Sequence, residues 1–127
     1  MNSIFLAIIL LGSFSYNYSN IEKADALFEQ GNQELIQYYN AHHNLDYSLF
    51  HKDDIQDYLD HIKEGLELLI HSGKIYFKEC QKNYQVKLFN KLKRINNIIY
   101  RYVNLLKQKD KDEIIKNWDI VKKYIKK

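Results

Sequence analysis

The feature that most constrains this chain is the scarcity of residues that interrupt helices. Its 127 residues contain no proline and only four glycines. Because proline and glycine shape most tight turns, turn-dense all-β folds and linker-rich chains are excluded. Hydrophobic residues make up 46% of the chain, which is enough for the core of one small domain and argues against disorder. We therefore expect a single domain built from long helices.

The N-terminus carries a short apolar run, Ile4–Leu11, followed by small residues that include Ser13 and Ser15. A run of this length is typical of a secretory signal and falls short of the roughly 20 residues that span a bilayer as a helix. The spacing of the two serines fits cleavage after the second. We therefore predict a signal peptide over residues 1–15 and a single helical domain over residues 16–127, exported to the periplasm or secreted. An uncleaved membrane anchor and a buried N-terminal helix are the alternatives.

Apolar side chains recur at steps of three and four residues along four segments, the spacing that places them on one face of a helix. The segments span about 21–40, 53–71, 74–108 and 110–124. Apolar helix faces must be buried against one another, which makes a bundle the simplest architecture. We predict an all-α fold, a small antiparallel helical bundle of about four helices with a long third helix, preceded by the signal-like segment.

Local signals set the expected helix ends. Gly31 lies within an apolar face and predicts either a close approach by another helix or a kink. Gly73 predicts the end of the second helix. The third segment has no breaker, and Asn96-Asn97 is its weakest point. Its apolar stripe, which ends in the heptad spacing of a coiled coil, is Phe77, Cys80, Tyr84, Leu88, Leu92, Ile95, Ile99, Tyr102 and Leu106.

Residues 24–40 carry a family resemblance. Ala26–Asn32 is followed by Leu35–Asn40, and Gly31 stands where a small residue precedes the turn between two helices. In these features the stretch resembles part of a tetratricopeptide repeat, although the closing proline and a second copy are absent. The resemblance implies packing as a helical hairpin and binding to other proteins.

Charge is distributed unevenly along the sequence. Residues 1–73 carry three lysines against eleven acidic residues, a net charge of −8, whereas residues 74–127 carry sixteen basic against five acidic residues, a net charge of +11. Three explanations fit: acidic and basic helices pack together within the chain, copies pair head to tail, or the basic half binds an anionic partner. The candidate residues for an anionic-partner surface are Lys78, Lys82, Lys87, Lys91, Lys93, Arg94, Arg101, Lys107 and Lys109.

Lipid headgroups fit the basic half best among anionic partners, because its long helical segment combines an apolar stripe with surrounding lysines. Nucleic acid is disfavoured as a partner. Export would remove most nucleic-acid targets, and Arg94 and Arg101 are the only arginines available for bidentate contacts to phosphates or bases.

Patterns for catalysis or cofactor binding are absent from the sequence. The glycines are scattered, so no phosphate-binding loop forms, and no serine sits in a nucleophile elbow. Cys80 is the only cysteine and lies in an apolar stripe, which predicts a buried thiol. Asp57 and His61 are four residues apart and share a helix face that could bind a metal. A second group of such residues is His42, His43, Asp46, His51, Asp53 and Asp54.

The simplest interpretation of both histidine groups is a solvated polar surface, so we predict no metal, no cofactor and no enzymatic activity. Two function classes follow. The first is an exported helical protein-interaction module that binds a protein partner or itself. The alternative is a peripheral membrane-surface protein that binds anionic lipid through its basic C-terminal half.

Overall fold

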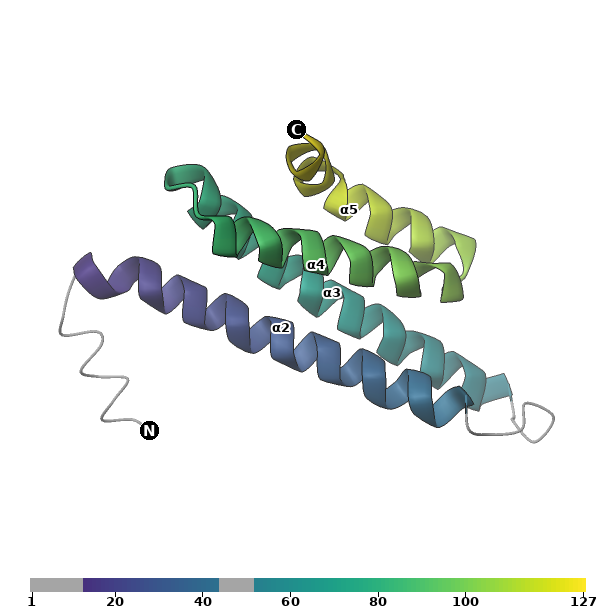
Figure 1. The fold of residues 1–127 in the computed structure, drawn as a ribbon. Helices are drawn as coiled ribbons and strands as arrows, with labels where there is room; N and C mark the ends of the chain where they lie inside the picture. Colours follow the sequence, from purple (N-terminus) through teal and green to yellow (C-terminus); the bar gives the residue numbers. More distant parts are fainter. Residues whose placement is uncertain (1–12, 44–51) are drawn as a thin grey trace, which may run out of the picture.

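The computed structural model describes residues 13–43 and 52–127, with side chains from 19 to 40 and from 55 to 127. The helices are α2 (Ser13–His43), α3 (Lys52–Lys82), α4 (Val86–Tyr102) and α5 (Gln108–Lys126), with a short 3-10 segment, η2 (Val103–Leu105), after α4. Successive helices run in alternate directions, and α3 contacts α2, α4 and α5 (Figure 1). Over these described residues, the predicted all-α bundle of four helices is confirmed.

A single apolar core fills the space around α3. The side chains of Trp118 and Tyr76 are the largest that are fully buried. The predicted heptad seam is buried within the chain, and its members are Leu92, Ile95, Ile99, Tyr102 and Leu106. The seam therefore packs against the other helices of the same chain, and α4 has no continuous apolar stripe exposed to solvent.

Two glycines bring α2 and α3 into close contact. A Cβ atom on Gly31 would lie 2.8 Å from the backbone oxygen of Gly65, and a Cβ atom on Gly65 would lie 2.9 Å from Cγ of Leu35. Only glycine fits such an approach without separating the helices. Of the two alternatives for Gly31, the close approach is the one observed, and α2 continues through this residue.

The predicted boundary between the second and third helices is wrong. Gly73 lies inside α3, buried against the ring of Trp118, and the helix continues to Lys82. The chain turns at residues 83–85 instead, where Gln85 adopts an extended conformation. A continuous helix would carry the seam beyond the end of the bundle into water, whereas this turn folds it back onto α3. The predicted long third helix is thereby reduced to α4, which has 17 residues.

Asn96-Asn97, the predicted weak point, lies within α4. The indole Nε1 of Trp118 donates a hydrogen bond of 2.9 Å to Oδ1 of Asn96. A buried indole N–H needs an acceptor, so Asn96 has a structural role in the core rather than marking a break.

Residues 24–40, which resemble a tetratricopeptide hairpin, belong to the one uninterrupted helix α2. Residues 1–12 of the predicted signal peptide lie outside the described residues, as do residues 44–51 between α2 and α3. Among the helices that the structure describes, none combines the length and the apolar character needed to cross a lipid bilayer.

Candidate functional site

The nine predicted basic residues do not form one surface. Around the turn between α3 and α4 lie Lys78, Lys82, Lys87 and Lys91. Midway along α4 lie Lys93 and Arg94. At the opposite end of the bundle lie Arg101, Lys107 and Lys109. Because α4 is about 25 Å long, the first and last groups are too far apart to contact the same small ligand.

Three helix ends meet beside the turn between α3 and α4. The ring of Tyr124 in α5 packs edge to face on Phe77 of α3, with centroids 5.1 Å apart, and on Phe89 of α4, with centroids 5.9 Å apart. The Tyr124 hydroxyl donates a hydrogen bond of 3.5 Å to Sγ of Cys80. This hydrogen bond and burial raise the pKa of Tyr124 to about 12. Cys80 is 1% exposed, which confirms the predicted buried thiol.

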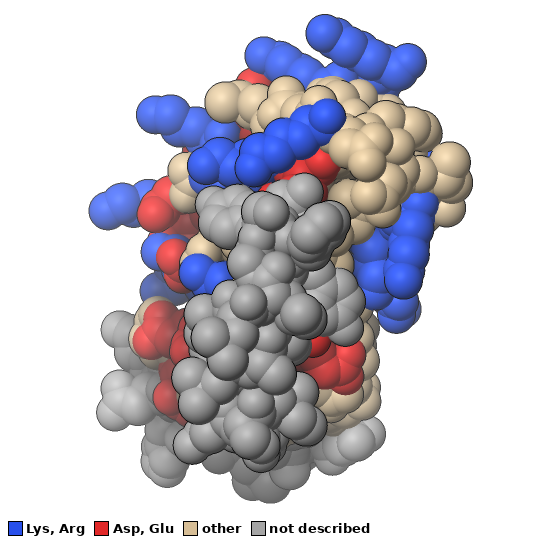
Figure 2. All heavy atoms as spheres, turned by 90° about the vertical axis from the view of Figure 1, so that its left-hand side faces the viewer, with Lys and Arg blue, Asp and Glu red and all other residues tan. Residues whose placement is uncertain are grey.

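This packing brings lysines from three helices to one end of the molecule. We call this group the basic end, and its members, all exposed, are Lys78, Lys82, Lys87, Lys123, Lys126 and Lys127. In the view of this end, Lys and Arg side chains gather over the upper part of the surface, which α4 and α5 occupy (Figure 2). The lysines of α5 were not among the predicted basic residues. The feature that could have identified them is the lysine-rich C-terminus, because an α5 antiparallel to α4 ends beside the turn between α3 and α4.

Two acidic residues of this end are already paired. The carboxylate of Glu79 is buried, at 5% exposure, and accepts a hydrogen bond of 3.0 Å from Nδ2 of Asn20. Lys82 lies 3.7 Å from the same carboxylate, and Lys123 lies 2.9 Å from Asp119. These pairs neutralise only part of the positive charge of the basic end.

The face of α4 that adjoins α2 has mixed charge. The ammonium of Lys91 and the guanidinium of Arg94 lie over the ring of Phe28, at 4.8 Å and 5.1 Å from its centroid. Nearby, Lys91 shares a hollow of about 370 Å³ with Asp25 of α2. Asp25 accepts a hydrogen bond from the hydroxyl of Tyr76, and burial together with this carboxylate raises the pKa of Tyr76. Acidic α2 thus offsets one face of basic α4, and Lys87 of the basic end lines the same hollow.

The turn itself presents apolar side chains to water. Tyr84, predicted to lie in the buried stripe, is 59% exposed, so that prediction is wrong, and Val86 is 62% exposed. The reason is that residues 83–85 leave the helix, so the stripe spacing no longer points Tyr84 toward the core. The Tyr84 ring still rests against Phe89, with centroids 5.9 Å apart.

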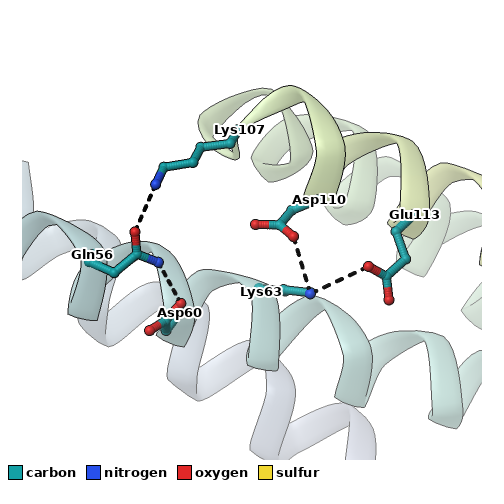
Figure 3. Close-up of polar contacts among 6 residues, drawn as sticks. All are labelled: Gln56, Asp60, Lys63, Lys107, Asp110 and Glu113. Atoms are coloured by element: carbon teal, nitrogen blue, oxygen red, sulfur yellow. Dashed lines mark hydrogen bonds and ion pairs between the residues drawn. The ribbon is translucent and has the colours of Figure 1, made fainter.

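At the opposite end of the bundle, the ion pairs between the acidic and the basic half of the chain have the opposite polarity to the one expected. Lys63, from the acidic half, lies 3.2 Å from Asp110 and 3.5 Å from Glu113 of the basic half (Figure 3). Lys107 donates a hydrogen bond of 2.8 Å to Oε1 of Gln56 rather than to a carboxylate. Within the described part of the chain, Lys63 makes the only ion pairs that join the two halves.

A histidine and three carboxylates meet between α2 and α3. Nδ1 of His61 lies 3.0 Å from Oε1 of Glu34 and 3.9 Å from Glu64, and its Nε2 lies 3.6 Å from Asp57. Tyr38 stacks on the imidazole at a centroid distance of 3.9 Å. The hydrogen bond to Glu34 raises the pKa of His61, against a smaller opposing effect of burial.

The ligand atoms of Glu34, His61 and Glu64 lie within 4.8 Å of one another, a set of one nitrogen and two oxygens that could hold a metal ion. The sequence pointed to Asp57 and His61 through their helical spacing, but Glu34 comes from another helix and was missed. The second predicted histidine group, including His42 and His51, lies outside the described side chains.

Comparisons with known proteins add nothing to this geometry. No family model, curated protein or solved structure matches the chain. The function is therefore argued from the residues of the bundle alone.

Proposed function

We propose that this chain is an exported, non-catalytic helical module that binds an anionic partner surface through its basic end. The observation that carries the proposal is the convergence of six exposed lysines from the ends of α3, α4 and α5. Like charges gathered on one face repel one another, and an anionic partner relieves that repulsion while the shared field attracts it.

The apolar surface supports binding through charge rather than through a helical seam. The coiled-coil seam is buried inside the chain, so it is not available to a second helix. The exposed large apolar residues of the described chain are Ile36, Ile55, Tyr84, Val86, Leu105 and Ile120. They are scattered over four helices, the turn between α3 and α4 and a 3-10 segment, whereas a partner that packs on a helix face needs residues at steps of three and four.

Binding to poly-glutamate, a soluble polyanion, tests the proposal. A triple variant, Lys78→Gln, Lys87→Gln and Lys126→Gln, removes exposed lysines of the basic end. Lys82 and Lys123 stay in place because they pair with Glu79 and Asp119. We expect the triple variant to bind about tenfold more weakly than the wild type, and the wild-type binding to weaken with added salt.

The matched control removes the same charge from the opposite end, through Arg101→Gln, Lys107→Gln and Lys109→Gln. It should retain nearly all of the binding, because these residues lie far from the basic end. Equal losses in the two triple variants would mean that net charge alone drives the binding, and the proposal would then be wrong.

A further inference from the structure

The turn between α3 and α4 carries two exposed apolar side chains next to lysines of the basic end. Tyr84 and Val86 are both more than half exposed, and in the sequence they stand between Lys82 and Lys87. The Tyr84 ring contacts the ring of Phe89, so its position is held by packing against α4. Lysines account for attraction to any anion, but they leave the two exposed apolar groups unexplained.

A lipid bilayer satisfies both features at once. Its phosphate and carboxylate headgroups attract lysines, each of which contributes about 1 kcal/mol near an anionic membrane. Below the headgroups it accepts apolar side chains, and tyrosine favours this interface because its ring is apolar and its hydroxyl is polar. An acidic protein surface would need a matching apolar pocket for Tyr84 and Val86, whereas a bilayer needs none.

The position of the N-terminus points to the same end. Nδ2 of Asn20 donates a hydrogen bond of 3.0 Å to Glu79, which places the start of α2 beside the end of α3. The chain enters α2 at Ser13, at the same end of the bundle as the turn (Figure 1). In the sequence, the apolar run Ile4–Leu11 ends two residues before that helix begins. Where the run is retained, it is attached at the end that carries the lysines.

We propose that the basic end docks on an anionic lipid bilayer, with the side chains of Tyr84 and Val86 inserted at the headgroup level and the lysines at the phosphates. The inference rests on the proposed function and adds the identity of the partner and of the inserted residues. No covalent step is involved.

A tryptophan reporter at the turn tests insertion directly in the full-length chain. Trp118 is the only tryptophan and is fully buried, so its signal can be subtracted using the wild type. The reporter variant is Tyr84→Trp, and the matched control is Leu105→Trp, at a partly exposed apolar position of η2 at the opposite end. The vesicles are phosphatidylcholine with or without phosphatidylserine, and their acyl chains are brominated where quenching is measured.

With phosphatidylserine present, emission from position 84 should shift to the blue and be quenched by brominated acyl chains, while emission from position 105 should not change. Without phosphatidylserine neither position should respond. An unchanged signal at position 84, or equal changes at both positions, would overturn the proposal. The equal result is the one expected if the N-terminal run alone brought the chain to the membrane.

A second variant separates this inference from the proposed function. Tyr84→Ser with Val86→Ser should lower partition into phosphatidylserine vesicles about tenfold and leave poly-glutamate binding unchanged. Wild-type partition by this variant would overturn the role of the turn. If the wild type binds poly-glutamate but not vesicles, the bilayer is the wrong partner and an acidic protein takes its place. If it binds neither, both proposals fail.

Discussion

Replacing Gly73 with alanine should destabilise the bundle, although alanine is the better helix former. A Cβ atom at this position would lie 2.5 Å from both Cη2 and Cζ3 of Trp118. Non-bonded carbon atoms normally stay about 3.5–4.0 Å apart, so the ring or the helix must shift by about 1 Å. The ring has little freedom to shift, because it is fully buried and its Nε1 bonds Asn96 at 2.9 Å.

Three contributions set the size of the effect. Overpacking a close-packed core costs about 1–3 kcal/mol, and weakening the hydrogen bond from Trp118 to Asn96 costs about 1 kcal/mol. Replacing a glycine inside a helix by alanine returns about 1 kcal/mol. We therefore expect Gly73→Ala to lower the free energy of unfolding by about 1–3 kcal/mol.

Urea unfolding followed by far-UV circular dichroism measures this loss in the wild type and in a Trp118→Phe background. Phenylalanine lacks the outer ring atoms that meet the new Cβ atom, so Gly73→Ala should become neutral or stabilising by about 1 kcal/mol there. An equal loss in both backgrounds would show that the contact with Trp118 is not the cause. It would mean that position 73 needs glycine for its backbone conformation, as a helix end would, rather than for space beside the indole.

Three further measurements probe the polar contacts and the thiol. Lys63→Met removes the cation shared by Asp110 and Glu113, and should lower the free energy of unfolding by about 1 kcal/mol. This loss should become smaller at high salt, and a loss that does not depend on salt would point to packing instead. Because the hydrogen bond to Glu34 raises the pKa of His61 above 6.5 in the fold, protonated His61 stabilises the bundle fully below about pH 6.5, and this contribution is lost as the pH rises through the raised pKa. The melting temperature measured against pH should show that loss, and Glu34→Gln should reduce it; the same slope in the variant would contradict the assignment. Cys80, at 1% exposure, should react with a thiol reagent only as fast as the bundle opens, and reaction at the rate of a free thiol would show that it is accessible.

Helical periodicity identified most of the core correctly. The seam from Leu88 to Leu106 and the apolar face that contains Ile114 and Trp118 are buried as predicted. Such faces can be found from sequence because the 3.6-residue repeat of a helix fixes which side chains share a side, whatever they later pack against. Tyr84 is the exception, since the chain leaves the helix there.

The ends of the helices were harder to predict from sequence. Gly73 has the signature of a helix stop, yet the indole of Trp118, far along the sequence, covers it and the helix continues. A single glycine can therefore mark the end of a helix in one context and a close contact between helices in another. Neighbouring residues alone do not distinguish the two.

The lysines of the candidate site were likewise only partly predictable from sequence. Counting charges found Lys78 and Lys87, because net charge is a sum over residues and needs no coordinates. It also grouped them with Lys109, which lies at the opposite end, and missed Lys126, which the packing of α5 brings close.

Three properties of the chain were predictable before any coordinates: that it is helical, which helix faces are apolar and how much positive charge its second half carries, since these are local or additive properties. The packing of the helices was needed to show which lysines share one end, that Glu34 contacts His61, and that the seam is buried within the chain. These are contacts between segments distant in sequence, and they depend on how close the helices approach, which at Gly31 and Gly65 is set by the absence of a side chain.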